Sequence, residues 1–373
     1  MTIAIIEPVG GHGGMDYYDY GLAYGIGSNN VEVLYYTCDK TTVRDFSNVS
    51  TIISFVRLWD TKLINKVYKY IKGHFESLKD AKQRGAKIVH LHFFTFRAID
   101  YLVLALARLM DFKTVVTVHD VNAFDKSANT FIEKKCYNLI DGIIVHNESS
   151  YNDLKKKNFK IKNIEIIPHG NYKPFIEAFP SRNIKTRKAD FSLLFFGQIK
   201  RVKGLDILLK AIKIVKDKGY NNIHLTVAGK AWKSDLDYYI ELINELGIQN
   251  EVETNFRYIP DDQVASFYAK ADLVILPYTE IYQSGVILLT MSYGKPVLCS
   301  DLDAFKEIVV DEQTGFLFKN KNEIDLANKI IYIYNHQEII NQVTSNSSIL
   351  MDTKYDWINI GRKTVDFYRL LKK

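Results

Sequence analysis

The chain has 373 residues, of which 47% are apolar and 25% are charged, and its formal net charge is +6. This length favours two domains of about 150–200 residues, each large enough to bury an ordinary core. The positive excess is too small to indicate a nucleic-acid partner by itself. The longest apolar run, near residues 101–107, falls well short of the ~18–20 residues that a membrane-spanning helix needs. We therefore expect a cytoplasmic protein that is at most peripheral to a membrane.

The three cysteines, Cys38, Cys136 and Cys299, include no Cys-x-x-Cys pair, which argues against a structural zinc site. Two of them lie beside apolar, strand-like runs. We expect buried free thiols in a reducing compartment.

Apolar runs that suit strands alternate with helix-like segments through the first half of the chain. We expect strands at 3–6, 31–36, 88–93, 114–120, 142–146 and 164–167. We expect helices at about 15–25, within 51–84 and at 98–109. A segment at 177–189 with one proline and four basic residues is predicted to be a linker.

The same alternation begins again after the linker. Strands are expected at 192–196, 224–228, 252–258, 273–276, 297–299 and 315–318. Helices are expected at 205–216, 236–246, 264–270, 286–293, 305–310, 323–335 and 355–371. This repetition predicts an α/β protein with two doubly wound, Rossmann-like domains that face each other across a cleft. We expect the domains to span 1–175 and 176–355, with a last helix at 356–373 that packs back on the first domain.

A glycine-rich loop, Gly10-Gly-His-Gly-Gly14, separates the first strand from the first helix. The order of strand, glycine loop and helix is typical of the opening of a nucleotide-binding sheet. The glycines do not have the GxGxxG spacing, so dinucleotide binding is not favoured. The loop is either a tight turn or a place where a ligand approaches the backbone closely.

Histidines follow or lie within two of the predicted strands. His119 and Asp120 end the strand at 114–120, the edge where open α/β sheets bind ligands. His119 is therefore a candidate contact for a sugar or a phosphate, while Asp120 is expected to cap the next turn. His90 and His92 point the same way from another strand and are an alternative metal pair. No third ligand lies at a convincing spacing, so a core or rim role is favoured for both.

Two segments of the second half have the features of anion sites. Lys200, Arg201 and Lys203 lie between glycines just before the helix at 205–216, where free N–H groups and positive charge would hold a phosphate. The alternative is a solvated cluster of charges. The second segment is the step Ser284-Gly285, which opens the helix at 286–293 after a buried strand and so exposes further unpaired N–H groups.

The long helix within 51–84 has lysines at 62, 66, 69 and 72 on one face. The simplest interpretation is a solvated helix face. The alternative is contact with an anionic membrane surface or with a pyrophosphate-bearing acceptor.

Several of these segments together resemble the GT-B glycosyltransferases of family 4 (group 1). In the second half they are Gly197-Gln-Ile-Lys-Arg-Val-Lys-Gly-Leu-Asp206, Val227-Ala-Gly229, Ile259-Pro-Asp-Asp262, Ala271-Asp-Leu-Val-Ile-Leu-Pro277, Gly294-Lys-Pro-Val297 and Glu307-Ile-Val-Val-Asp-Glu-Gln-Thr-Gly315. Gly13-Gly14 and His119-Asp120 resemble the N-terminal loop and the cleft histidine of that family. The resemblance covers essentially the whole chain.

The resemblance implies roles for individual residues. Lys203 matches the donor-phosphate lysine, and Lys200 is assigned as the second phosphate cation. His119 would contact the donor sugar, and these three residues are the expected catalytic residues. The base should lie near Arg257 and Tyr258. The expected donor-binding residues are Gly13, Gly14, Gly197, Gln198, Arg257, Tyr258, Glu280, Tyr282, Gln283, Ser284, Gly285, Val286 and Thr290.

One departure from the family pattern concerns two glutamates that family members have eight positions apart. Tyr282 and Thr290 stand at these places, and neither can hold a hydroxyl as a carboxylate would. Glu280 lies two residues earlier. A subgroup with Gln-Ser-Gly at this point shares the departure, so an inactive protein is not inferred.

The implied function is transfer of a sugar from a UDP- or GDP-linked donor to a saccharide or polyprenyl-diphosphate-linked acceptor in cell-surface polysaccharide synthesis. The resemblance implies retention of anomeric configuration, no metal and no other cofactor. An inverting enzyme would need a carboxylate base, for which Asp16, Asp19 and Asp120 are candidates. The alternatives are a non-catalytic sugar-nucleotide-binding or partner protein and, with less support, a glycan phosphorylase or epimerase.

Overall fold

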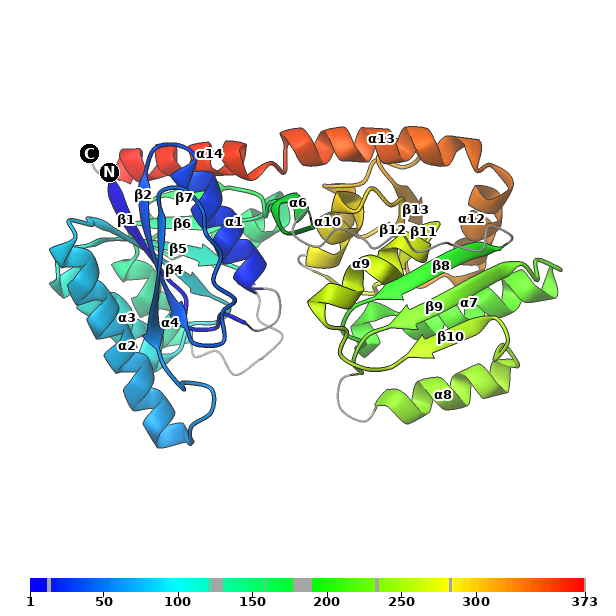
Figure 1. Cartoon of the computed structure of the whole chain (residues 1–373), viewed down its shortest axis with the longest axis horizontal. Helices are drawn as coiled ribbons and strands as arrows, with labels where there is room; N and C mark the ends of the chain where they lie inside the picture. The colour runs from blue at the N-terminus through cyan, green and yellow to red at the C-terminus, as the bar shows by residue number, and fades with distance from the viewer. Residues whose placement is uncertain are drawn as a thin grey trace. The chain divides into compact units, whose positions relative to one another are not determined.

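The structure is a computed structural model of the 373-residue chain. It describes residues 1–11, 15–119, 121, 130–157, 159–176, 190–231, 235–281 and 284–371. The chain divides into two compact units. Unit 1 comprises residues 1–170 and 354–373, and unit 2 comprises residues 171–353 (Figure 1). The predicted linker at 177–189 lies outside the described residues.

Unit 1 is built on a seven-stranded sheet in the order β3-β2-β1-β4-β5-β6-β7. All neighbouring strands are parallel, from β1 paired with β2 to β6 paired with β7. The strands are β1 (Thr2–Ile6), β2 (Glu32–Cys38), β3 (Val49–Phe55), β4 (Ile88–Phe93), β5 (Lys113–Val118), β6 (Gly142–Val145) and β7 (Ile164–Ile166). The helices of unit 1 are α1 (Met15–Gly27), α2 (Leu63–Gln83), α3 (Ala98–Leu109), α4 (Thr130–Leu139), α5 (Glu148–Lys156) and α14 (Trp357–Leu371).

The two faces of this sheet differ in character, because alternate residues of a strand point to opposite sides. On one face Ala4, Ile6 and Leu91 join an apolar cluster that includes Leu78 of α2 and Leu104 of α3. On the other face the polar side chains of His90 and Thr117 form hydrogen bonds with Tyr368 of α14 and Tyr18 of α1. This second face positions the histidines described below.

Unit 2 is built on a six-stranded sheet in the order β10-β9-β8-β11-β12-β13, again with all neighbouring strands parallel. The strands are β8 (Phe191–Phe196), β9 (Ile223–Ala228), β10 (Val252–Asn255), β11 (Leu273–Leu276), β12 (Val297–Ser300) and β13 (Phe316–Phe318). The helical segments are α6 (Lys173–Ile176), η1 (Arg201–Lys203), α7 (Leu205–Asp217), α8 (Asp235–Leu246), α9 (Asp261–Lys270), α10 (Gly285–Ser292), α11 (Asp303–Lys306), α12 (Glu323–Asn335) and α13 (Glu338–Thr353).

The prediction of two doubly wound α/β units is confirmed, and so is the burial of all three free cysteines. Six elements were missed: β3, whose residues were placed in or before a long helix, the helices α4, α5, α6 and α13, and the short 3-10 helix η1. Helix α9 begins before the predicted start at residue 264, because Pro260 is its N-cap and Asp261 and Asp262 lie in its first turn. Within the described residues, no helix has both the length and the apolar content needed to cross a membrane.

Helices α1 and α14 contact each other at glycine residues, so the last helix of the chain packs directly on the first. A Cβ at Gly361 would lie 2.0 Å from the carbonyl carbon of Gly25, and a Cβ at Gly25 would lie 2.0 Å from the carbonyl oxygen of Trp357. The Trp357 ring also lies against Gly21. Gly25 and Gly361 thus allow backbone atoms of the two helices to approach, and Gly21 leaves room for the Trp357 ring. This contact is closer than any side chain allows.

We expect Gly361→Ala to lower the free energy of unfolding by about 1–3 kcal/mol, because the added methyl group overpacks the contact with α1. Urea unfolding followed by tryptophan fluorescence measures the effect. Lys363→Ala, two residues along on the exposed side of α14, is the matched control and should change stability by less than about 0.5 kcal/mol. Equal stability of the two variants would contradict the close contact.

Candidate functional site

In unit 2 the loop after β8 packs closely against the residues that follow β11. Gly204 has a φ of 64°, and a Cβ there would lie 1.9 Å from the carbonyl oxygen of Pro277. Only glycine combines this backbone conformation with this approach. The amide of Thr279 donates to the carbonyl of Val202 at 2.9 Å and holds the same two segments together. The short helix η1 is therefore fixed beside the carboxyl end of the neighbouring strand.

Lys203 ends η1 and lies over an aromatic ring. Its Nζ is 3.6 Å from the centroid of the buried Tyr278 ring, a cation–π distance. Burial, together with the positive charge of Lys200, lowers the pKa of Lys203 to about 7. An anion beside this ammonium would favour its charged form.

The N-terminus of α10 lies next to the same loop. A Cβ at Gly197 would lie 3.3 Å from a methyl group of Val286 in the first turn of α10. Ser284 is the N-cap residue, and its side chain makes no capping hydrogen bond. A Cβ at Gly285 would lie 2.6 Å from the hydroxyl of Tyr172, so this tyrosine also lies at the start of the helix. The first turn of a helix presents N–H groups and positive potential, which suit a phosphate.

The other predicted donor residues of unit 2 differ in their surroundings. Gln198 and Glu280 are exposed. Arg257 and Tyr258 follow β10, where the guanidinium donates to Gln263 at 2.8 Å and the tyrosine is 68% exposed.

Thr290 is a correction to the predicted donor site. It is fully buried, and its hydroxyl donates to the Val286 carbonyl at 2.7 Å, so it lies on the buried face of α10. Gly13, Gly14, Tyr282 and Gln283 lie outside the described residues.

In unit 1, histidines from four consecutive strands gather around the ring of Tyr18. They lie at or just after the carboxyl ends of β4, β5, β6 and β7, with ring centroids 4.9–5.2 Å from that of Tyr18: His92, His119, His146 and His169. Sequence reasoning identified the first two and missed the last two. The sequence pattern that could have identified them is a histidine at or just after the end of each of four successive strands.

The gathered histidines are neutral near pH 7. Burial lowers the pKa of His92 and of His169 to about 4 and that of His146 to about 3. The pKa of His119 is held well below its usual range by burial and by its histidine neighbours. His119 stacks on Phe94, and its Nδ1 lies 3.3 Å from Nε2 of His146. A neutral imidazole suits hydrogen bonding to a hydroxyl group better than neutralisation of a phosphate.

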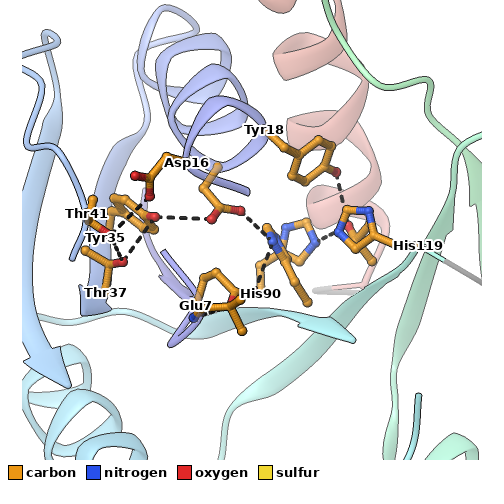
Figure 2. A network of polar contacts seen from close by, with 12 residues as sticks. Glu7, Asp16, Tyr18, Tyr35, Thr37, Thr41, His90 and His119 are labelled. Carbon is orange, nitrogen blue, oxygen red and sulfur yellow. Dashed lines mark hydrogen bonds and ion pairs between the residues drawn. The ribbon is translucent and has the colours of Figure 1, made fainter. Parts of the chain in front are cut away.

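Three carboxylates were candidates for a catalytic base, and Figure 2 labels one of them, Asp16. Asp16 is half-buried and accepts hydrogen bonds from Thr41 and from the amide of Thr42. Asp19 is 0% exposed, so it cannot reach a substrate hydroxyl and that candidacy is wrong. Asp120 lies outside the described residues.

His90 and His92 do not form a metal pair, because the two nitrogens of His90 are already occupied. Its Nδ1 lies 2.6 Å from the hydroxyl of Tyr368, and its Nε2 lies 2.8 Å from the hydroxyl of Thr117. The core role expected for His90 is confirmed.

Helix α2 presents large apolar side chains to the surface. Leu63, Ile64 and Tyr68 are 76%, 85% and 64% exposed. The four lysines predicted to share one face alternate with them along the sequence: Lys62, Lys66, Lys69 and Lys72. The first turns of α2 are therefore both apolar and basic, the composition of a helix that lies on a membrane surface.

Two family models match the chain, one on each unit. The model described as glycosyl transferases group 1 matches residues 177–348, and the model described as glycosyltransferase family 4 matches residues 12–170. The first match contains η1 and α10, and the second contains Tyr18 and all four histidines around it.

Individual proteins to which this chain is similar are also named as glycosyltransferases. An uncharacterized glycosyltransferase from Methanocaldococcus jannaschii is 26% identical over 192 residues, which cover 51% of this chain and 47% of that protein. A GDP-mannose:glycolipid 4-beta-D-mannosyltransferase from Xanthomonas campestris pv. campestris is 24% identical over 163 residues, 44% of each. The chain thus spans about half the length of the curated relatives it matches. The fold resembles that of Anabaena HepE in complex with UDP, with a TM-score of 0.72 and 17% identity over 99% of this chain and 100% of that chain.

We expect the ammonium group of Lys203 to titrate near pH 7 in the ligand-free protein, because burial and Lys200 disfavour its charged form. NMR of lysines carrying ¹³C-methyl groups measures the midpoint, with Lys203→Arg assigning the signal. Lys200→Gln should raise the midpoint, and Lys210→Gln on the exposed side of α7 should leave it unchanged. A midpoint near the usual lysine value would contradict the buried environment.

Proposed function

This chain belongs to the group 1 (family 4) glycosyltransferases, and on that premise we propose that it transfers a sugar from a nucleotide-diphosphate donor to a glycan or lipid-linked acceptor. UDP- and GDP-linked sugars are the proposed donors. The similarity to a glycolipid mannosyltransferase and the fold shared with a UDP complex support this class of substrates.

The observation that carries the proposal is the arrangement at the edge of the unit 2 sheet. Lys203 lies over Tyr278 beside Lys200, and the loop that carries these lysines contacts the first turn of α10. Breaking a sugar–phosphate bond leaves negative charge on the diphosphate. Cations and helix N–H groups at this position stabilise that charge most in the transition state.

In the proposed mechanism the lysines and α10 hold the diphosphate without a metal ion, and the acceptor attacks from the side of the departing group. The anomeric configuration is then retained. The complete burial of Asp19 is consistent with this route, because it removes one candidate for the base that an inverting reaction needs. His119, as a neutral hydrogen-bonding group, would orient a hydroxyl of the donor sugar.

Slow donor hydrolysis tests the reaction class without knowledge of the acceptor. We expect release of UDP or GDP from a sugar nucleotide to fall about 100-fold in Lys203→Ala, because a charge that stabilises the leaving group is lost. Lys210→Ala is the matched control, since this exposed lysine lies on the next helix. Unchanged hydrolysis in Lys203→Ala would contradict the role of the lysine. Tight nucleotide binding without turnover in the wild type would instead favour a non-catalytic binding protein.

A lipid-linked acceptor requires the protein to work at a membrane surface, and the exposed residues of α2 support such contact. We expect sedimentation with phosphatidylglycerol vesicles, weak sedimentation with phosphatidylcholine vesicles, and release by salt. Replacing Leu63 and Ile64 by serine should weaken binding at least tenfold, because both side chains lose contact with the acyl region. Leu109→Ser, at an equally exposed position on α3, should not. Vesicle binding that depends neither on lipid charge nor on these substitutions would overturn this part of the proposal.

A further inference from the structure

Three metal-ligating side chains from separate elements of unit 1 converge at a buried point. They are Glu7 just after β1, Asp19 on α1 and His92 on β4, and one ligand atom of each lies within 4.8 Å of the others. All three residues are buried. We propose that Glu7, Asp19 and His92 form a structural site for one divalent transition-metal ion. The site is independent of the proposed reaction.

The distances within the cluster are short. His92 Nδ1 lies 2.7 Å from Asp19 Oδ1 and 3.8 Å from Glu7 Oε2. The shorter contact lacks the alignment of a hydrogen bond. Within the described residues, Asp19 Oδ1 and both ring nitrogens of His92 have no hydrogen-bond partner. Buried polar atoms are nearly always satisfied, and a cation bound between these atoms would give each of them a partner.

The other carboxylate oxygens are already held in place. Glu7 Oε1 accepts a hydrogen bond from the amide of Val9 at 2.6 Å, and Asp19 Oδ2 accepts one from the hydroxyl of Tyr35 at 3.2 Å (Figure 2). Each carboxylate is thus oriented with one oxygen bonded and the other turned toward His92. Hydrogen bonds of this kind orient the ligands of metal sites.

The charge of the cluster also favours a cation. Two carboxylates lie together out of contact with water, and the ion pairs of the described residues give neither of them a lysine or arginine partner. Burial raises the pKa of Glu7 to about 8 and that of Asp19 well above its usual range, so without a cation these groups hold protons that a bound ion would displace. A divalent ion would compensate the charge of both carboxylates in full.

One imidazole nitrogen and two carboxylate oxygens are a ligand set for Zn²⁺, with a water molecule as the fourth ligand. Bonds of about 2.1 Å keep tetrahedral ligands about 3.4 Å apart. The carboxylate of Asp19 and the ring of His92 would therefore separate by less than about 1 Å when the ion binds. The ion would join the ends of β1 and β4 to α1, the helix whose Tyr18 lies among the histidines.

The test is the metal content of the full chain, expressed without a histidine tag in zinc-supplemented medium and analysed by plasma mass spectrometry. We expect about one Zn²⁺ per chain in the wild type and less than about a tenth of that in His92→Gln and in Asp19→Asn. His74→Gln is the matched control, because His74 is a fully buried histidine of α2 outside the cluster, and it should retain the ion. Equal zinc in the wild type and both site variants would mean surface binding and would overturn the proposal.

A second measurement uses only the wild type, in case the variants fold poorly. After removal of metal with a chelator, addition of Zn²⁺ at about 100 times its Kd should raise Tm by roughly 5–10 °C, and Mg²⁺ should not. A wild type that holds no zinc and gains no thermal stability from it would show that protons, not a metal ion, fill the space between the three side chains.

Discussion

The parallel alignment of the strands is the constraint on which every candidate residue depends. In a parallel sheet all carboxyl ends meet at one edge, so residues far apart in sequence come together there without any other device. In unit 2 this brings the loop after β8 against the end of β11 and the start of α10. In unit 1 it brings one histidine from each of four strands around Tyr18.

The two edges differ in electrostatic character. The unit 2 edge has lysines, one of which is partly buried against Tyr278 and beside Lys200, so the diphosphate that we propose to bind there would favour the charged form of Lys203. The unit 1 edge has neutral imidazoles whose burial disfavours added charge. The first arrangement suits a leaving group that gains negative charge, and the second suits the hydroxyl groups of a sugar.

The polar face of the unit 1 sheet depends on close helix packing. Gly25 and Gly361 let α1 and α14 touch through their backbones, and α14 supplies the hydroxyl of Tyr368 to His90. With α1 in this place, Asp19 lies against His92, one of the four histidines around Tyr18. A sheet face with this many polar groups is stable only when each of them has a partner, which is the physical basis for the proposed ion.

The sequence alone determined the class of fold and indicated the residues of the anion site that we propose in unit 2, because the patterns that mark each segment are local in sequence. Apolar runs alternate with helical segments, and Lys200, Lys203 and Gly285 lie close to the glycines and helix starts that give them meaning. Sequence patterns missed β3, an edge strand in which polar and apolar residues are mixed and most side chains are partly exposed. They also placed Thr290 in the donor site, although its side chain is buried. Only the tertiary structure decided which distant residues meet. Glu7, Asp19 and His92 lie on three elements separated by many residues, so no spacing in the chain indicates their convergence; the register of β1 with β4 and the packing of α1 bring them together.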